Sequence, residues 1–137
     1  MKVKLDAWAY KPTRGHGTDA GLDLRADMDM LILPHGHGIF HTGVHVQLPK
    51  GTCGLLVSKS GLNVKSNIIS TGLIDEGYTG EICVKLYNQG ETSYEVHKGD
   101  KISQLVILPC IIEDLEFVDE LDGNTERGEN GFGSTGK

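Results

Sequence analysis

The final eleven residues, RGENGFGSTGK (127–137), combine the residue types that a nucleotide ligand requires. Glycines let backbone N–H groups approach an anion closely, and the guanidinium group of Arg127 can hold a phosphate through two parallel hydrogen bonds. The ring of Phe132 offers a flat face for a base. The segment does not match a P-loop, which needs a preceding strand, a following helix and a hydroxyl residue after the lysine. Composition alone favours a disordered glycine-rich end over a ligand-binding segment.

A second candidate is a carboxylate in the stretch GLIDEGYTGEI (72–82). Asp75 follows three largely apolar residues and precedes a Glu-Gly turn. A carboxylate on the apolar approach to a hairpin is a candidate general base. The alternative is a turn aspartate that hydrogen-bonds its own backbone, which is the commoner role.

A third candidate is SKSGLN (58–63), where Lys59, Ser60 and Gly61 begin a predicted short helix. A helix N-terminus that carries a hydroxyl and a lysine is suited to binding an anion. A helix-capping role for Ser60 is equally favoured by this pattern.

Four histidines lie close together in the sequence, at His35, His37, His41 and His45. They invite a metal interpretation, but their spacing matches no fixed ligand pattern. His41 and His45 fall on the polar face of their strand, and the other two fall in a predicted turn. We therefore favour solvated histidines over a metal site.

Alternating apolar and polar residues predict that strands position these candidates. The predicted strands lie at 27–33, 44–48, 81–88 and 102–109, and the predicted short helix lies at 59–66. Glycine and proline turn signals separate them, which indicates an all-β sandwich or barrel of many short strands. We expect a β-barrel body at 1–120 and a mobile, glycine-rich C-terminal arm at 121–137.

The composition excludes several classes of function. A formal net charge of −6 argues against binding to polymeric nucleic acid or to an anionic membrane. The sequence has no apolar run long enough to span a membrane, and its start has no signal-peptide core. Cys53, Cys83 and Cys110 are widely spaced and form no CxxC pair, so neither a zinc site nor a disulfide framework is expected. A cytoplasmic location fits this usage best.

Five stretches, in order, resemble the five motifs of the homotrimeric dUTPases and together cover essentially the whole chain. They are AGLDLRA (20–26), SKSG (58–61), TGLIDEGYTGEI (71–82), GDKISQLV (99–106) and RGENGFGSTG (127–136). The resemblance implies a distorted jelly roll and a trimer with active sites at subunit interfaces. A neighbour's C-terminal arm then closes over each site, which explains why a ligand-like segment stands at the chain's end.

The implied reaction converts dUTP and water to dUMP and pyrophosphate. By the resemblance, Asp75 orients and deprotonates the attacking water, and Mg²⁺ is carried on the phosphates with Asp23 near it through water. Tyr78 packs on the deoxyribose and leaves no room for a 2′-hydroxyl. The other implied substrate-binding residues are Lys59, Ser60, Gly61 and Gln104 at the phosphates, Leu73 and Ile74 at the uracil edge, and Arg127, Phe132, Gly133 and Ser134 in the arm. Cys83 is also implied, because it stands where the family often has another substrate-touching residue.

Three positions depart from the family pattern. Lys59 and Lys101 stand where many members have arginine, so each retains its charge but loses the bidentate fork. Ile69 stands where many members have an asparagine that contacts uracil. Recognition of uracil is therefore expected to rest more on main-chain groups.

Two other functions remain as alternatives. A dCTP deaminase shares this fold and would release ammonia rather than pyrophosphate, but the arm and the Asp75–Tyr78 pair favour the dUTPase. The second alternative is a nucleotide-dependent regulatory protein that binds a protein partner, as some virus-encoded dUTPases are thought to do. Both a cellular and a viral source fit the resemblance.

Overall fold

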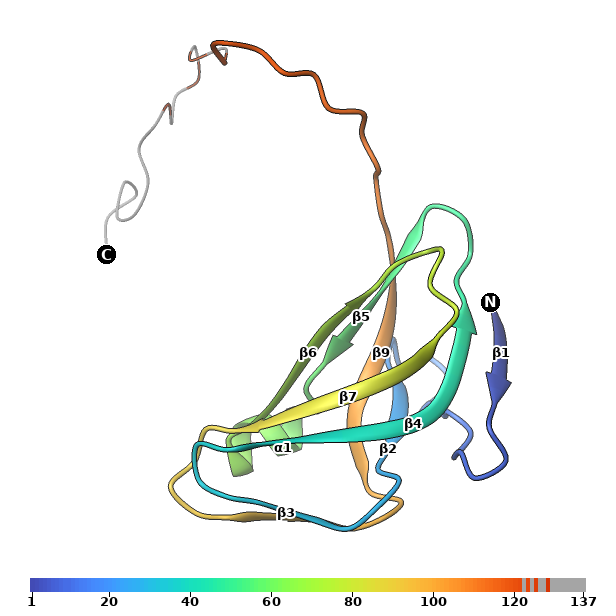
Figure 1. Ribbon diagram of the computed structural model, residues 1–137, viewed down its shortest axis with the longest axis vertical. Coiled ribbons are helices and arrows are strands. Elements are labelled where there is room, and N and C mark those ends of the chain that lie inside the picture. Colours follow the sequence, from blue (N-terminus) through green and yellow to red (C-terminus); the bar gives the residue numbers. More distant parts are fainter. Residues whose placement is uncertain (122, 124, 126–127, 129–137) are drawn as a thin grey trace.

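Short antiparallel strands dominate the chain, which is seen in a computed structural model that describes residues 1–121, 123, 125 and 128 (Figure 1). The elements of these residues are β1 (Lys2–Leu5), β2 (Leu22–Arg25), β3 (Met30–Ile32), β4 (His37–Gln47), β5 (Thr52–Val57), α1 (Ser60–Ser66), β6 (Ile68–Ile74), β7 (Glu81–Asn88), β8 (Tyr94–Val96) and β9 (Lys101–Pro109). The prediction of an all-β fold with one short helix is confirmed.

Seven of the described strands form one sheet in the order β1-β4-β7-β6-β5-β9-β2, and β3 pairs with β8 in a separate ribbon. The large sheet curls on itself, so β4 and β7 lie in front of β9 and β2 (Figure 1). This curl gives the body the form of a distorted jelly-roll barrel. The buried side chains inside it include Phe40, Leu86, Ile102 and Leu105.

The alternation in β7 shows how the sequence builds this core. Ile82, Val84 and Leu86 are fully buried, while Cys83 between them is exposed. Successive side chains of a strand point to opposite faces, so the apolar set fills the barrel and the intervening residues face outward. The outward face of β7 is thereby available for chemistry.

The predicted strands agree with the structure to different extents. The predictions at 81–88 and 102–109 are confirmed to within a residue, whereas 44–48 is only the end of the eleven-residue β4. His37 was expected in a turn and is instead the first residue of β4.

The prediction of a strand at 27–33 is wrong for its first three residues and for Leu33. Only Met30–Ile32 forms a strand, β3. The side chain of Asp27 accepts a hydrogen bond from the backbone of His41 at 3.1 Å, and that of Asp29 accepts one from the backbone of Lys98 at 2.6 Å. Such side-chain bonds to backbone groups compete with a regular strand.

The helix at 59–66 is confirmed as Ser60–Ser66, but the capping role suggested for Ser60 is wrong. Lys59 occupies the N-cap position and makes no side-chain capping bond, so Ser60 is the first helical residue. Helix α1 is also not long or apolar enough to cross a membrane, and no other helix occurs among the described residues.

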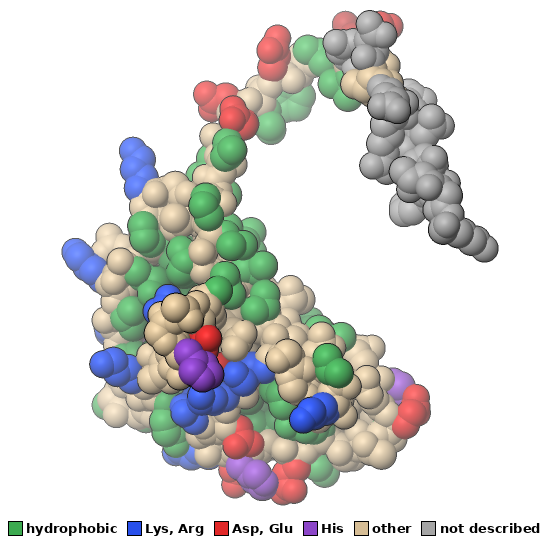
Figure 2. Space-filling view, turned by 180° about the vertical axis from the view of Figure 1, so that it is seen from behind, with side chains coloured by type: hydrophobic (Ala, Val, Ile, Leu, Met, Phe, Trp, Pro, Cys, Tyr) green, Lys and Arg blue, Asp and Glu red, His purple; other side chains and the backbone are tan. Residues whose placement is uncertain are grey.

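After Pro109 the chain leaves the sheet and extends away from the body (Figure 1). Residues 110–121 form no strand, and their large apolar side chains are between 53% and 91% exposed. Figure 2 shows these hydrophobic side chains along the extended segment. They are Ile111, Ile112, Leu115, Phe117, Val118 and Leu121. Most of the arm expected at 121–137 lies outside the described residues.

Candidate active site

One part of the candidate site is centred on Asp23, which β2 places in the barrel wall with only 4% of its side chain exposed. Lys59 lies 2.5 Å from its Oδ1 and Lys101 lies 2.7 Å from its Oδ2. The side-chain amide of Gln104 lies 3.4 Å from Oδ1. One carboxylate is therefore held between two ammonium groups.

The sheet register explains why these residues meet. Asp23 pairs with Gln104 across β2 and β9, and Gln104 pairs with Val57 across β9 and β5. Lys59 follows Val57 by two residues and Lys101 begins β9, so both lysines reach the carboxylate from neighbouring segments. The resemblance assigned Asp23, Lys59 and Gln104 to the site, and the structure brings them together.

The charges in this cluster favour an anion. Burial raises the pKa of Asp23, but hydrogen bonds from Lys101 and Lys59 outweigh it and hold the pKa below its ordinary value. Asp23 is therefore ionised at neutral pH and compensates only one of the two lysine charges. The remaining positive charge, beside the exposed Ser60 and Gly61 at the start of α1, is suited to a phosphate.

Gly21 was not selected as a site residue from the sequence, although it stands in the AGLDLRA stretch. A Cβ at this position would lie 2.9 Å from Cβ and Cδ of Gln104. The side chain of Gln104 can therefore occupy its present position only because residue 21 is glycine. Lys101 was noted only as a departure from the family pattern, and its contact with Asp23 could not be read from the local sequence.

The second part of the candidate site is the turn between β6 and β7, which carries Asp75 and Tyr78. Asp75 is exposed and directly follows the last residue of β6. The backbone N–H of Tyr78 donates to the carbonyl of Asp75 at 3.1 Å, and its phenol donates to the carbonyl of Glu81 at 2.9 Å. A Cβ at Gly80 would overlap the phenol ring, so this glycine lets the ring lie across the turn.

The strands β6 and β7 separate as they approach this turn. Among the described residues their pairing covers Ile68–Ser70 on β6 and Leu86–Asn88 on β7, and it goes no further toward the turn. Leu73 is 63% exposed and lies beyond this paired region. The β7-facing backbone edge of residues 71–74 is therefore outside the ladder and can serve as a hydrogen-bonding edge for a base.

Cys83, which the resemblance placed among the substrate-binding residues, also lies beyond the paired region. Its side chain is exposed and lies opposite His41 on β4. The four histidines singled out in the sequence do not converge, since within the part of the chain that the structure describes only His41 of the four belongs to a group of potential metal ligands. His45 is not simply solvated, because its side chain is only 18% exposed and lies 3.3 Å from Asp6.

The two parts of the candidate site are well separated within one chain. Ile74, next to Asp75, pairs with Gly54, and Gly54 pairs with Ile107. At about 3.3 Å per strand residue, Ile107 lies about 10 Å along β9 from Gln104. Three strand spacings of about 4.8 Å also separate β6 from β2, which carries Asp23. The structure therefore does not bring Asp75 to the Asp23 cluster of the same chain.

Mg²⁺ in proteins is usually bound by oxygen ligands. Asp23 offers a carboxylate, but both of its oxygens lie against lysine ammonium groups. Direct coordination would place the ion against these two charges, whereas contact through water leaves the ion pairs intact. The residues therefore fit a Mg²⁺ that is carried by phosphates and not one held in a protein cage. Arg127, Phe132, Gly133 and Ser134 lie outside the described residues.

Comparison with known proteins gives concordant results. A family model described as dUTPase matches residues 8–136. The deoxyuridine 5′-triphosphate nucleotidohydrolase of Mus musculus is 44% identical over 136 residues, which are 98% of this chain and 83% of that protein.

Two solved structures of phage proteins extend this likeness to the fold. The dUTPase of Staphylococcus bacteriophage 80alpha with dUpNHpp has a TM-score of 0.91 and 34% identity, covering 99% of this chain and 98% of that chain. Phage dUTPases, the class to which that protein belongs, control transfer of virulence genes. A mutant dUTPase from phage phi11 of S. aureus, described with a structural Mg(II) ion, has a TM-score of 0.80 and 30% identity, covering 88% of this chain and 97% of that chain.

Proposed function

The chain belongs to the dUTPase family and hydrolyses dUTP, and we propose that it does so by attack of an Asp75-oriented water on the α-phosphorus. The observation that carries this mechanism is the placement of an exposed carboxylate on the turn after the open edge of β6. A carboxylate on a constrained turn can hold a water in line with the phosphorus and accept its proton. The products are dUMP and pyrophosphate.

The Asp23 cluster binds the phosphates in this proposal. Lys59, Ser60, Gly61 and Gln104 supply charge and hydrogen-bond donors, and Lys101 adds the second ammonium group. Asp23 holds the lysines in place rather than contacting the phosphates itself, because two anions repel one another. Preorganised donors of this kind stabilise the charge that develops as the phosphorus is attacked.

The β6–β7 turn recognises the nucleoside. The backbone edge at Leu73 and Ile74 contacts the base, and Cys83 lies across the opening from this edge. The ring of Tyr78, fixed by its bond to the carbonyl of Glu81, forms a wall against the sugar. A wall at that position excludes a 2′-hydroxyl and so separates dUTP from UTP.

The C-terminal arm, residues 121–137, completes the site in this proposal, which rests on the sequence resemblance. Phe132 stacks on the base, and Arg127, Gly133 and Ser134 bind the phosphates. Closure of the arm excludes water from the phosphates and strengthens the remaining contacts.

The proposed cofactor is Mg²⁺, and the relative described with a structural Mg(II) ion supports it. When bound, the ion neutralises charge on the triphosphate and fixes the geometry of its oxygens. Asp23 would hold the ion through water, because its own oxygens are engaged by Lys59 and Lys101.

A homotrimer is the proposed assembly, with each active site shared between subunits. Two observations support it. Asp75 and the Asp23 cluster lie apart within one chain, so each needs the complementary part from a neighbour. The apolar side chains of residues 110–121 are exposed along a segment that leaves the body (Figure 2), and a neighbouring subunit would bury them.

A cytoplasmic location is proposed from the thiols. Cys53, Cys83 and Cys110 are all free in the structure, which is typical of a reducing compartment. A regulatory role through a protein partner is a second candidate function, favoured by the likeness to a phage protein whose class is said to control transfer of virulence genes.

A substrate panel tests the proposed function. The full-length chain is assayed with Mg²⁺ and dUTP, dCTP, dTTP or UTP, and pyrophosphate and ammonia are measured in parallel. We expect pyrophosphate release from dUTP at a rate far above that from the other three nucleotides. Ammonia release from dCTP would instead identify a deaminase, and equal pyrophosphate release from dUTP and UTP would contradict the proposed sugar wall.

A further inference from the structure

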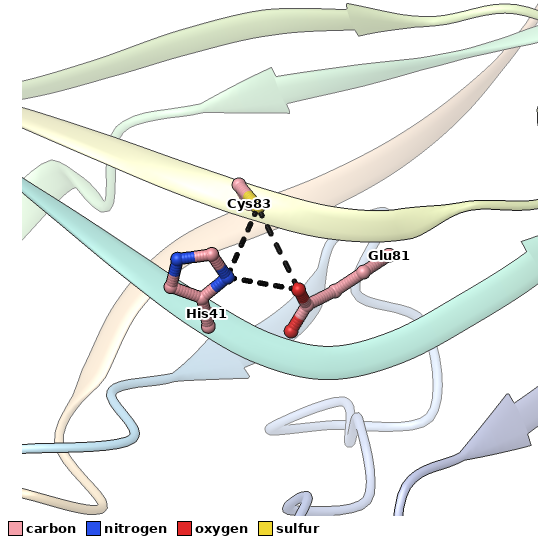
Figure 3. Close-up of side chains that lie close together, drawn as sticks. All are labelled: His41, Glu81 and Cys83. Carbon is pink, nitrogen blue, oxygen red and sulfur yellow. Dashed lines mark hydrogen bonds and ion pairs between the residues drawn. The ribbon is translucent and has the colours of Figure 1, made fainter.

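Three potential metal ligands converge on the outer face of the β4–β7 pair, separate from the Asp23 cluster (Figure 3). They are a ring nitrogen of His41, a carboxylate oxygen of Glu81 and the thiol sulfur of Cys83, and these atoms lie within 4.8 Å of one another. Imidazole, carboxylate and thiol together form a mixed nitrogen, oxygen and sulfur donor set. Such a set differs from the oxygen ligands that Mg²⁺ prefers.

The sheet register explains the convergence. His41 lies directly opposite Cys83 on antiparallel strands, and Glu81 precedes Cys83 by two residues, so all three side chains share one face. The ladder is irregular between His41 and His45, and within this bulge Gly43 adopts a φ of +62°. Bulges commonly redirect side chains next to functional sites.

The bulge also fixes the orientation of the Glu81 carboxylate. The backbone N–H of Gly43 donates to Oε1 of Glu81 at 2.8 Å. The other oxygen, Oε2, therefore faces His41 and Cys83. Metal-ligating side chains are typically held in this way by a second hydrogen bond to the surrounding protein.

The distances between the donor atoms match those of a tetrahedral metal site. The Nδ1 of His41 lies 2.9 Å from Oε2 of Glu81, and the Sγ of Cys83 lies 3.6 Å from that nitrogen and 3.9 Å from that oxygen. Tetrahedral Zn²⁺ with its usual bond lengths requires about 3.3 Å between nitrogen and oxygen and about 3.6 Å from sulfur to either atom. Each separation therefore needs to change by only about 0.4 Å or less.

The local charges favour a cation at this position. Oε2 of Glu81 lies 2.9 Å from Nδ1 of His41, and the side chain of Asp27 accepts a hydrogen bond from the backbone N–H of His41 at 3.1 Å, so two carboxylates flank the donor atoms. A metal ion among the three donors would compensate these carboxylates and favour the thiolate.

We propose that His41, Glu81 and Cys83 form a binding site for a borderline-soft divalent transition metal, with Zn²⁺ as the favoured occupant. Three protein ligands leave a fourth tetrahedral position for water. The simpler alternative is a surface ion pair between His41 and Glu81 beside an unrelated thiol, which would contribute little energy. The two interpretations differ in whether Cys83 contributes to metal binding.

The test uses the full-length chain, reduced with a phosphine and freed of metal. It is titrated with Co²⁺, whose bond to a thiolate gives a charge-transfer absorption, and then with Zn²⁺ as a competitor. We expect one Co²⁺ per chain with the thiolate absorption, displaced by one equivalent of Zn²⁺, and one zinc per chain by elemental analysis after dialysis. Absence of the thiolate absorption, or zinc well below one per chain, would overturn the proposal.

Variants identify the ligands. Cys83→Ser, His41→Asn and Glu81→Gln should each weaken Zn²⁺ binding by about 100-fold or more, since loss of an outer-shell partner alone costs about 10–100-fold. Glu81→Gln is the most conservative of them, because its amide oxygen can still accept from Gly43. Circular dichroism establishes that each variant is folded before titration.

Two matched controls complete the experiment. His35 lies 3.3 Å from Glu91 in an exposed histidine–carboxylate pair that is not part of a three-ligand group in the described residues. His35→Asn and Cys53→Ser should therefore retain wild-type Zn²⁺ affinity. Equal losses in these controls, or unchanged affinity in Cys83→Ser, would show that the bound metal is held elsewhere. The readout is metal content, so its failure would leave the proposed dUTP hydrolysis unaffected.

Discussion

The Nζ of Lys101 lies 2.7 Å from the Oδ2 of Asp23, a carboxylate that is almost completely buried. The Nζ of Lys59 lies 2.5 Å from the other carboxylate oxygen, Oδ1. A carboxylate so placed cannot be freely available to a metal ion or a substrate. It acts instead as the anchor that holds two cations at the barrel surface, and the phosphate-binding proposal depends on that anchor.

Asp23→Asn should lower both stability and activity. Neutralising the anchor removes the ion pairs to Lys59 and Lys101, and we expect a loss of about 1.5–3 kcal/mol in the free energy of unfolding, the value of a hydrogen bond to a charged group. Urea denaturation measures the loss, and dUTP hydrolysis should fall with it. Asp114→Asn, in the exposed segment after β9, is the control and should stay within about 0.5 kcal/mol of wild type. An unchanged urea midpoint in Asp23→Asn would show that the ion pairs add nothing to stability.

The same carboxylate predicts a pH dependence of stability. Because the lysines hold the pKa of Asp23 below its unfolded value of about 3.9, its contribution is fully present above that pH. The contribution is lost as pH falls through the lower, folded-state pKa. Urea midpoints measured from neutral pH downward should therefore converge for wild type and Asp23→Asn in strong acid. A difference between the two proteins that is constant with pH would contradict this linkage.

Gly21→Ala should reduce activity through Gln104. The new Cβ would lie 2.9 Å from two carbons of that side chain, which must move away from its present position. We expect a lower kcat/KM for dUTP with little loss of stability, because Gln104 is at the barrel surface rather than in the core. Gly17→Ala is the matched control, since a Cβ there meets nothing within 4 Å. Equal activity of the two variants would mean that the position of Gln104 does not matter for turnover.

The sequence alone predicted the strands whose apolar and polar residues alternate within a short stretch of the chain. Strand β7 carries apolar residues at alternate positions from Ile82 to Leu86, and its bounds and this buried face were predicted correctly. Strand β1, by contrast, has four exposed residues, and short strands of this kind carry no burial signal. It is ordered by pairing with β4, which no local window contains.

For the site residues too, the sequence predicted which residues take part but not which of them contact one another. The motif resemblance located Asp23, Lys59 and Gln104, yet nothing in the local sequence indicates that Lys59 and Asp23, 36 residues apart, form an ion pair. The proximity of His41 and Cys83, 42 residues apart, depends on the register of β4 against β7 and on the bulge at Gly43. Long-range register of this kind is set by the packed sheet and not by spacing along the chain.

Tyr78 should control discrimination against ribonucleotides. Tyr78→Ala removes the ring wall, and we expect the ratio of kcat/KM for dUTP to that for UTP to fall by about 10-fold or more, comparable to removing one packing contact of about 1.4 kcal/mol. Tyr78→Phe keeps the ring but loses the bond to the carbonyl of Glu81, so it should retain most of the discrimination. If Phe and Ala variants lose discrimination equally, the hydroxyl rather than the ring wall is responsible.

Asp75→Asn should abolish most turnover while leaving assembly and nucleotide binding intact. Removal of a general base commonly costs about 10²–10⁴ in rate. Asp75 is exposed, so the substitution should not affect folding. Pyrophosphate release and equilibrium binding of dUTP measure the two effects separately. Wild-type turnover in this variant would remove Asp75 from the mechanism.

Mixing two inactive variants tests whether the site is shared between subunits. One chain carries Asp75→Asn, and the other carries Lys59→Ala with Gln104→Ala, which damages the phosphate-binding part. If the chain forms the proposed homotrimer and Asp75 of one subunit serves the Asp23 cluster of its neighbour, random assembly from equal amounts should give intact pairs at about one quarter of the sites. We therefore expect about a quarter of wild-type activity after subunit exchange, which mass spectrometry of the mixed trimers verifies. Exchange without recovery would place both parts of each site in the same chain, although β5, β9 and several strand residues separate them in the structure.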